Sequence, residues 1–137
     1  MAEAIDQRGF LAKAEEGLAA AESEYANLRY NTCSRLAYYS CFHAAVAALL
    51  AAGVPLPQGG GVWSHAFVQA EFVRRCINER KRYPSALGEV LSRTYDLRQA
   101  ADYTAEQISQ TAAQRALRRA SEFVLAIMRE RQGGDQP

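Results

Sequence analysis

The segment from Asn31 to Ala52 most restricts how this chain can fold, because it has the pattern of a helix that is apolar almost all the way round. It begins at a residue type that favours helix N-termini and ends before Gly53 and the breaker VPLPQGGG. A helix with apolar residues on every side needs neighbours on several sides to cover it. The segment therefore predicts the central helix of a helical bundle.

Four further segments show apolar residues at the three- and four-residue spacing of a buried helix face, and no segment alternates as a half-buried strand would. They span 6–24, 64–79, 85–101 and 109–131, and the expected N-caps are Asp6, Asn31 and Ser85. A chain of 137 residues is long enough for one hydrophobic core. The predicted fold class is all-α, an up-and-down bundle of four long helices plus a shorter element. One domain is expected over 1–131, followed by a disordered tail over 132–137.

Composition places the chain among globular proteins, with 49% apolar and 23% charged residues. The first residues lack a basic stretch followed by an apolar stretch, so we expect no signal peptide. The longest apolar run, Ala44 to Ala52, is much shorter than the roughly 20 residues that span a bilayer. Cys33, Cys41 and Cys76 are odd in number and lack CxxC spacing. We therefore expect a protein of the reducing cytoplasm with no membrane segment.

The formal net charge of +1 conceals a basic stretch, RRCINERKR, from Arg74 to Arg82. This stretch could meet the phosphates of a nucleic acid, or it could be an ordinary solvated helix end. The loop from Gly53 to Gly61 is rich in glycine and proline, and we expect it to be mobile. It has no following GK[ST] and no preceding strand, so it does not match a phosphate-binding loop.

The stretch SRLAYYSCFHAA places polar side chains inside the apolar helix. Arg35, Tyr39 and His43 are spaced by four residues and so share one face. His43 is either a hydrogen-bonded core residue or a catalytic group. Arg35 cannot lose its charge, so on a covered face it needs a carboxylate or phosphate partner. Within the chain, the candidates for that partner are Asp96 and Asp102.

A second polar group stands in YDLRQAADYT, near the end of the fourth predicted helix. Arg98 and Asp102 are four residues apart and can form an ion pair within the helix. Alternatively, Arg98 faces a phosphodiester and Tyr103 assists it, which requires the pair to lie in a cleft.

Metal and serine chemistry find little support in the sequence. The two histidines, His43 and His65, lie on different predicted helices, with no cysteine pair or carboxylate cluster at ligand spacing beside them. No serine stands in a nucleophile-elbow context. We expect no metal, no other cofactor and no hydrolytic serine.

Several stretches taken together resemble the HEPN domain in its small, stand-alone prokaryotic form. The family's second helix is similar to SRLAYYSCFHAAVAALL, its third to SHAFVQAEFVRRCI, and its fourth and fifth to LRQAADY followed by TAAQRALRRASEFVLAIM. The resemblance runs from about Phe10 to Met128 in the order of the family's helices. It implies an all-α bundle, frequent homodimers, and a nucleotidyltransferase partner in a two-gene toxin–antitoxin module.

Many HEPN proteins resemble metal-independent RNases, in which an arginine is followed after four to six residues by a histidine. A histidine can exchange protons with the ribose 2′-hydroxyl and the leaving oxygen, and an arginine stabilises the charge of the phosphorane. By this resemblance Arg98 is the motif arginine, but Tyr103 stands where a histidine is expected. A phenol is a poor general base at neutral pH. His43 would have to enter the same cleft from the second helix to replace it.

The leading hypothesis is a homodimeric HEPN protein that associates with nucleotides or RNA, works with a nucleotidyltransferase partner and has no strong catalysis of its own. Its polar network is expected to consist of Arg35, Tyr39, His43 and Asp102, to be buried, and to pair Arg35 with Asp102. One alternative is an atypical metal-independent RNase toxin that uses Arg98 and Tyr103, with His43 and Asp102 as further members of its site. Another alternative is a non-catalytic protein-interaction bundle.

Overall fold

The computed structural model describes residues 2–55, 57 and 63–134, and all regular elements in these residues are helical. In chain order they are α1 (Ala2–Ala26), α2 (Tyr30–Ala51), α3 (His65–Glu71), the π-helical η2 (Phe72–Glu79), the 3₁₀ segment η3 (Ser85–Glu89), α4 (Val90–Tyr103) and α5 (Gln110–Gly134). The prediction of an all-α fold is therefore confirmed. The stricter prediction, an up-and-down bundle of four long helices plus a shorter element, stays a prediction.

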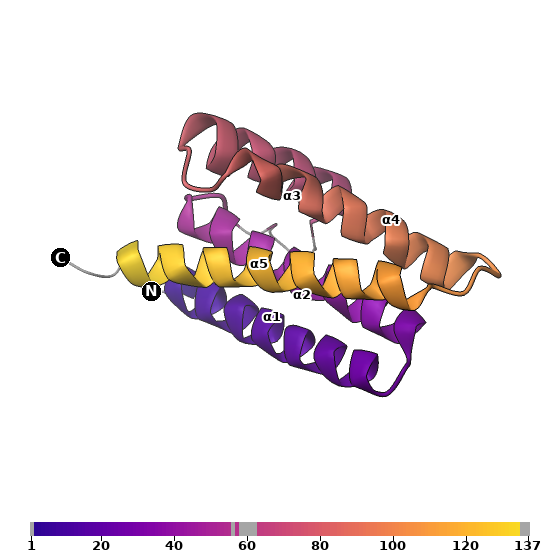
Figure 1. The fold of residues 1–137 in the computed structure, drawn as a ribbon. Coiled ribbons are helices and arrows are strands. Elements are labelled where there is room, and N and C mark those ends of the chain that lie inside the picture. Colours follow the sequence, from indigo (N-terminus) through magenta and orange to yellow (C-terminus); the bar gives the residue numbers. More distant parts are fainter. Residues whose placement is uncertain (1, 56, 58–62, 135–137) are drawn as a thin grey trace.

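α2 lies at the centre of the fold, in contact with α1, α4 and α5. Figure 1 shows α1 on one side of α2 and α4 on the other, with α5 in front. Buried residues occur along nearly the whole helix, among them Cys33, Ala37, Cys41, Ala45 and Leu49. Neighbours thus cover α2 on several sides, as its apolar pattern predicts.

The main core forms where the middle of α2 meets η2, α4 and α5. Phe72 and Phe123 are both fully buried, and their ring centroids lie 5.1 Å apart. Leu49 and Leu91 are also fully buried, and removing side chains of this size from water contributes about 1.5–3 kcal/mol each. Burial raises the pKa of Cys41 to about 12. Its thiol therefore stays protonated and packs as a small apolar group.

The three predicted N-caps are wrong. Asp6 lies inside α1, which begins at Ala2. Asn31 lies within the first turn of α2. Ser85 begins η3, and α4 starts only at Val90. A side-chain cap contributes only about 1 kcal/mol, so tertiary contacts that extend or shift a helix readily override it.

The third predicted helix, 64–79, begins as expected but changes its winding at Phe72. Ser64 caps α3, because its side chain accepts a hydrogen bond of 3.1 Å from the backbone N–H of Phe67. In the wider π-helical turn, residues that are four and five positions apart along the chain lie on the same side of the helix. The residues of η2 that this side buries are Phe72, Cys76 and Ile77.

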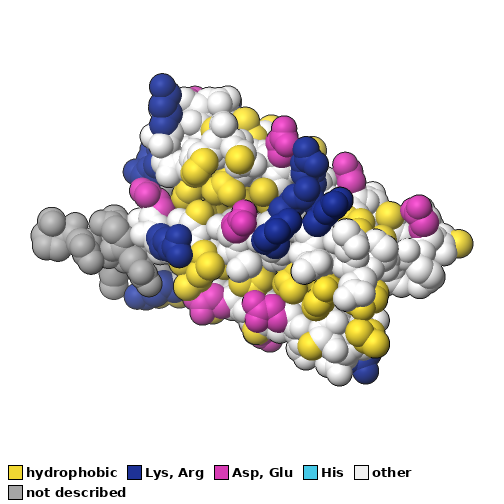
Figure 2. Space-filling view, in the orientation of Figure 1, with side chains coloured by type: hydrophobic (Ala, Val, Ile, Leu, Met, Phe, Trp, Pro, Cys, Tyr) yellow, Lys and Arg dark blue, Asp and Glu magenta, His cyan; other side chains and the backbone are white. Residues whose placement is uncertain are grey.

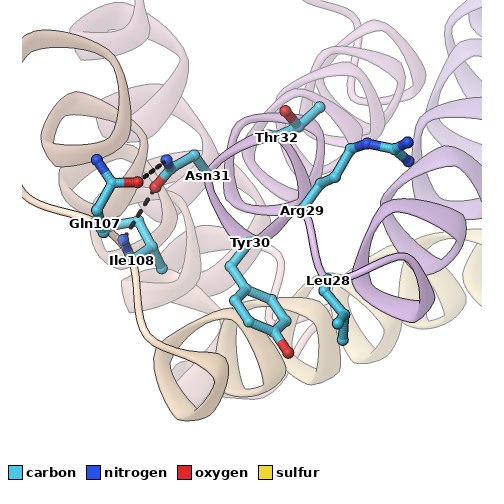
Figure 3. Close-up of a pocket in the computed structure, with 7 residues that line it drawn as sticks. All are labelled: Leu28, Arg29, Tyr30, Asn31, Thr32, Gln107 and Ile108. Atoms are coloured by element: carbon cyan, nitrogen blue, oxygen red, sulfur yellow. Dashed lines mark hydrogen bonds between the residues drawn. The ribbon is translucent and has the colours of Figure 1, made fainter.

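The side chain of Asn31 joins the start of α2 to the connection between α4 and α5. Its Nδ2 donates to Oε1 of Gln107 at 2.9 Å, and its Oδ1 accepts from the backbone N–H of Ile108 at 3.0 Å. Figure 3 shows both bonds at a pocket of about 360 Å³. In Figure 1 this connection and the α1–α2 turn lie at the end opposite the chain termini. Asn31 thereby anchors the segment that follows Tyr103.

Two predicted features fall partly outside the described residues. α5 continues to Gly134, so the predicted tail over 132–137 starts as helix, and 135–137 are not described. Most of the predicted mobile loop from Gly53 to Gly61 is likewise outside the described part of the chain. Among the described helices, none combines the length and the apolar character needed to cross a bilayer.

Candidate functional site

Asp102, in the last turn of α4, forms ion pairs with two arginines, Arg35 and Arg98. Its Oδ1 accepts a hydrogen bond from Nε of Arg35 at 2.7 Å, which joins α2 to α4. Its Oδ2 lies 2.9 Å from Nε of Arg98, as an ion pair that lacks hydrogen-bond alignment. Asp102 is therefore the partner that Arg35 needs, whereas Asp96 is exposed on the same helix. The predicted pairing of Arg35 with Asp102 is present.

Aromatic rings surround the guanidinium group of Arg98. Its Nη2 donates to the hydroxyl of Tyr39 at 3.0 Å. Its Cζ lies 5.4 Å from the ring centroid of Tyr39, 5.6 Å from that of Tyr103 and 5.9 Å from that of Tyr38. These distances permit cation–π attraction. Burial lowers the pKa of Arg98, but Tyr39, Tyr103 and Asp102 raise it by more, so the group stays charged. We call Arg35, Tyr39, Arg98, Asp102 and Tyr103 the Arg98 cluster.

The Arg98 cluster is open to solvent on one side, although we expected a buried network. The Asp102 and Arg98 side chains are 13% and 18% exposed, whereas that of Arg35 is 41% exposed. Tyr103 is 71% exposed. Since two guanidinium groups share one carboxylate, the cluster carries excess positive charge at its surface. Among the described residues, the terminal nitrogens of Arg35 have no hydrogen-bond partner, so they can receive an anion.

His43 points away from this cluster, toward α1. It lines a groove of about 330 Å³ between α1 and α2 together with Lys13, Gly17 and Tyr39. Its ring centroid lies 6.0 Å from that of Phe10 and 6.4 Å from that of Tyr39. Burial, and then the charge of Lys13, lower its pKa. His43 contacts the Arg98 cluster at the ring of Tyr39.

The histidine that lies on the α4 side is His65, at the start of α3, which sequence reasoning missed as a site residue. Its Nδ1 is 3.1 Å from the hydroxyl of Tyr38. Its ring stacks on Tyr95 of α4, with centroids 3.8 Å apart and planes at 11°. Burial lowers the pKa of His65, against the opposing charge of Asp96, so the ring favours its neutral form. Tyr38 thus lies between His65 and the guanidinium of Arg98.

No sequence signal links His65 to Arg98, because they are separated along the chain and join only through the packing of α2, α3 and α4. Asn31 was missed for a similar reason, since its partners come from the connection before α5. Within the described ranges, no group of three or more His, Cys, Asp or Glu side chains stands close enough together to hold a metal ion.

The all-α fold of the described residues agrees with the family comparison. The HEPN domain model matches residues 8–131, so this chain belongs to the HEPN family. One relative is a protein of Methanocaldococcus jannaschii that carries the name "Putative toxin MJ0605". It is 32% identical to this chain over 111 residues, which cover 81% of this chain and 78% of the relative.

Replacing Asp102 with asparagine tests whether the shared carboxylate stabilises the fold. Asp102→Asn keeps the size of the side chain but leaves Arg35 and Arg98 without a counter-charge. Because the site is partly exposed, we expect the free energy of unfolding to fall by about 1–3 kcal/mol in urea denaturation.

The matched control is Glu89→Gln, which removes the ion-pair partner of Arg93. This is a surface pair, because the side chain of Glu89 is 70% exposed and that of Arg93 is 56% exposed. This change should cost less than about 0.5 kcal/mol. Equal losses for the two variants would show that the shared carboxylate contributes no more than a surface pair.

Proposed function

We propose that this chain is the toxin-like member of a two-gene toxin–antitoxin module and that it acts in the cytoplasm on RNA or nucleotides. In this proposal the Arg98 cluster is a phosphate-binding site. The observation that carries it is the sharing of Asp102 by Arg35 and Arg98 beside the exposed ring of Tyr103. The name of the Methanocaldococcus jannaschii relative and the HEPN family support the toxin-like role.

The chemistry of the cluster suits a ribonucleotide chain. Guanidinium groups bind phosphate through paired, charge-assisted hydrogen bonds, and Arg35 has exposed nitrogens for this purpose. Exposed aromatic rings stack on unpaired bases, and Tyr103 is such a ring beside a cation. A small ligand without a base would make no use of Tyr103.

Strong catalysis is not part of the main proposal. Tyr103 stands at the position where the family's RNase motif has a histidine, and a phenol keeps its proton at neutral pH. Arg98 can stabilise a phosphate or a phosphorane, but it cannot accept a proton. Binding with weak or no cleavage is therefore the role that these side chains support best.

Arg98→Ala tests the phosphate-binding role. We expect it to weaken binding of a labelled 20-nucleotide single-stranded RNA about 10- to 100-fold, because a charge-assisted contact is lost. It should also abolish growth arrest when the protein is produced in a bacterial host. Fluorescence anisotropy and growth curves measure the two effects.

Arg74→Ala serves as the control for Arg98→Ala, because it removes the same charge from a 52% exposed side chain on η2. It should change RNA affinity less than about twofold. If Arg98→Ala and Arg74→Ala both bind RNA and arrest growth like the unmodified chain, the protein-interaction alternative is favoured instead.

A metal-independent RNase is the second candidate function, and the position of His65 favours it. His65 reaches Tyr38, whose ring lies 5.9 Å from the guanidinium of Arg98. A neutral imidazole can take a proton from a ribose 2′-hydroxyl while an arginine stabilises the phosphorane. The missing histidine of the motif would then be supplied from α3.

Cleavage assays with EDTA present test this second candidate. If it is correct, His65→Ala and Arg98→Ala each lower the rate at least about 100-fold, the usual contribution of general acid–base catalysis. His43→Ala is the matched control, since His43 lines the groove on the α1 side, and it should retain most of the rate. Absence of cleavage by the unmodified chain would rule this candidate out.

We further propose a homodimer and a nucleotidyltransferase partner, both from the resemblance to HEPN proteins of toxin–antitoxin modules. Light scattering at micromolar concentration should give twice the mass of the chain. Co-expression with a nucleotidyltransferase encoded beside it should yield one complex by gel filtration. A monomer mass would contradict the first statement, and separate elution would contradict the second.

A further inference from the structure

The basic stretch that the sequence singled out is partly paired with carboxylates. Arg74, Arg75 and Arg82 have such partners, whereas Arg80 and Lys81 have none among the described residues. Glu71 lies 3.0 Å from Nη2 of Arg74 and 2.7 Å from Nε of Arg75. Arg82 lies 3.7 Å from Glu130 of α5. Paired charges of this kind attract polyanions weakly, because their field is cancelled at short range. The RRCINERKR stretch therefore fits the solvated helix end better than the nucleic-acid contact.

A different group of arginines, on α5, lacks such partners. Arg118 and Arg119 stand three and four residues after Arg115, so both adjoin Arg115 on the helix surface. Arg115 and Arg118 are exposed and Arg119 is partly buried. Among the described residues, none of the three has a carboxylate within ion-pair distance. Like charges at this spacing oppose helix formation, so the arrangement favours a polyanionic partner.

The surface around these arginines is continuous with α4. Arg119 lines a shallow pocket of about 290 Å³ with Arg93 and Glu122. Glu89, on the same rim, is already paired with Arg93 at 3.0 Å. Figure 2 shows Lys and Arg side chains gathered in one patch on this face, and Figure 1 shows α5 beginning at the end where α4 finishes. Arg119 thus lies beside η3 and the first turn of α4.

We propose that Arg115, Arg118 and Arg119 form a second contact surface that binds the phosphate backbone of single-stranded RNA. This inference rests on the proposed function, because it adds a second RNA contact to the one proposed at the Arg98 cluster. A row of guanidinium groups on an open helix face fits a repeating phosphate chain, since each group can bind one phosphate independently. A free nucleotide needs an enclosing pocket instead.

The test is the salt dependence of RNA binding by a variant that combines Arg115→Gln, Arg118→Gln and Arg119→Gln. Glutamine keeps a long polar side chain with good helix propensity. With the labelled 20-nucleotide RNA, we expect binding to weaken about tenfold or more. The slope of log K against log[salt] should fall in magnitude by about 2, since each lost phosphate contact on a single strand removes about 0.7.

The control variant combines Arg74→Gln, Arg75→Gln and Arg82→Gln, which removes the same formal charge from arginines that have carboxylate partners. For this control variant, the slope of log K against log[salt] should stay within about 0.5 of the slope of the unmodified chain. Circular dichroism should show that both variants remain helical. Equal slope changes in the two variants would mean that net charge alone governs binding, and this would overturn the inference.

The outcomes separate this inference from the proposed function. If the unmodified chain does not bind RNA, the inference fails together with the RNA-binding part of the proposed function. If it binds RNA and the α5 variant keeps the same affinity and slope, only the inference fails. A variant that keeps RNA binding but loses its complex with the nucleotidyltransferase would assign the α5 arginines to a protein interface instead.

Discussion

The need to cover α2 on several sides governs the rest of this structure. Because its apolar residues face in every direction, α1, α4 and α5 all pack against it. Where α4 covers α2, the guanidinium group of Arg35 lies against α4. It stays protonated there and therefore needs a counter-charge. Asp102 satisfies it and at the same time pairs with Arg98. The polar site is thus a consequence of how the most apolar helix is enclosed.

The same packing assigns different surroundings to the two histidines. His43 shares a helix face with Arg35 and Tyr39, yet it ends in the groove beside α1. His65 comes from another helix and stacks on Tyr95, next to the aromatic group around Arg98. A shared face spans a wide arc of a helix, so different neighbours can cover its two edges. α3 therefore brings a second histidine to the aromatic group around Arg98, on the side away from His43.

Local patterns predicted the helices well, because burial of an apolar stripe requires a helical period that is visible in the sequence. They also predicted the pairing of Arg35 with Asp102, because a covered arginine has few possible acidic partners. The N-caps Asp6, Asn31 and Ser85 were wrong, since a cap preference is weak beside tertiary contacts. The π-helical winding of η2 left no pattern to detect.

By itself, the sequence determined an all-α chain, a central helix from about Asn31 to Ala52, and the polar residues that this helix brings against α4. Only the tertiary structure decided which tyrosine lies between each histidine and Arg98, and which arginines keep their charge unpaired. Charge depends on neighbours in space, and Glu71, Glu79 and Glu130 pair with three arginines of a stretch that looks basic in the sequence. Apolar periodicity is a local property, whereas an ion pair across helices is formed only when the chain has folded.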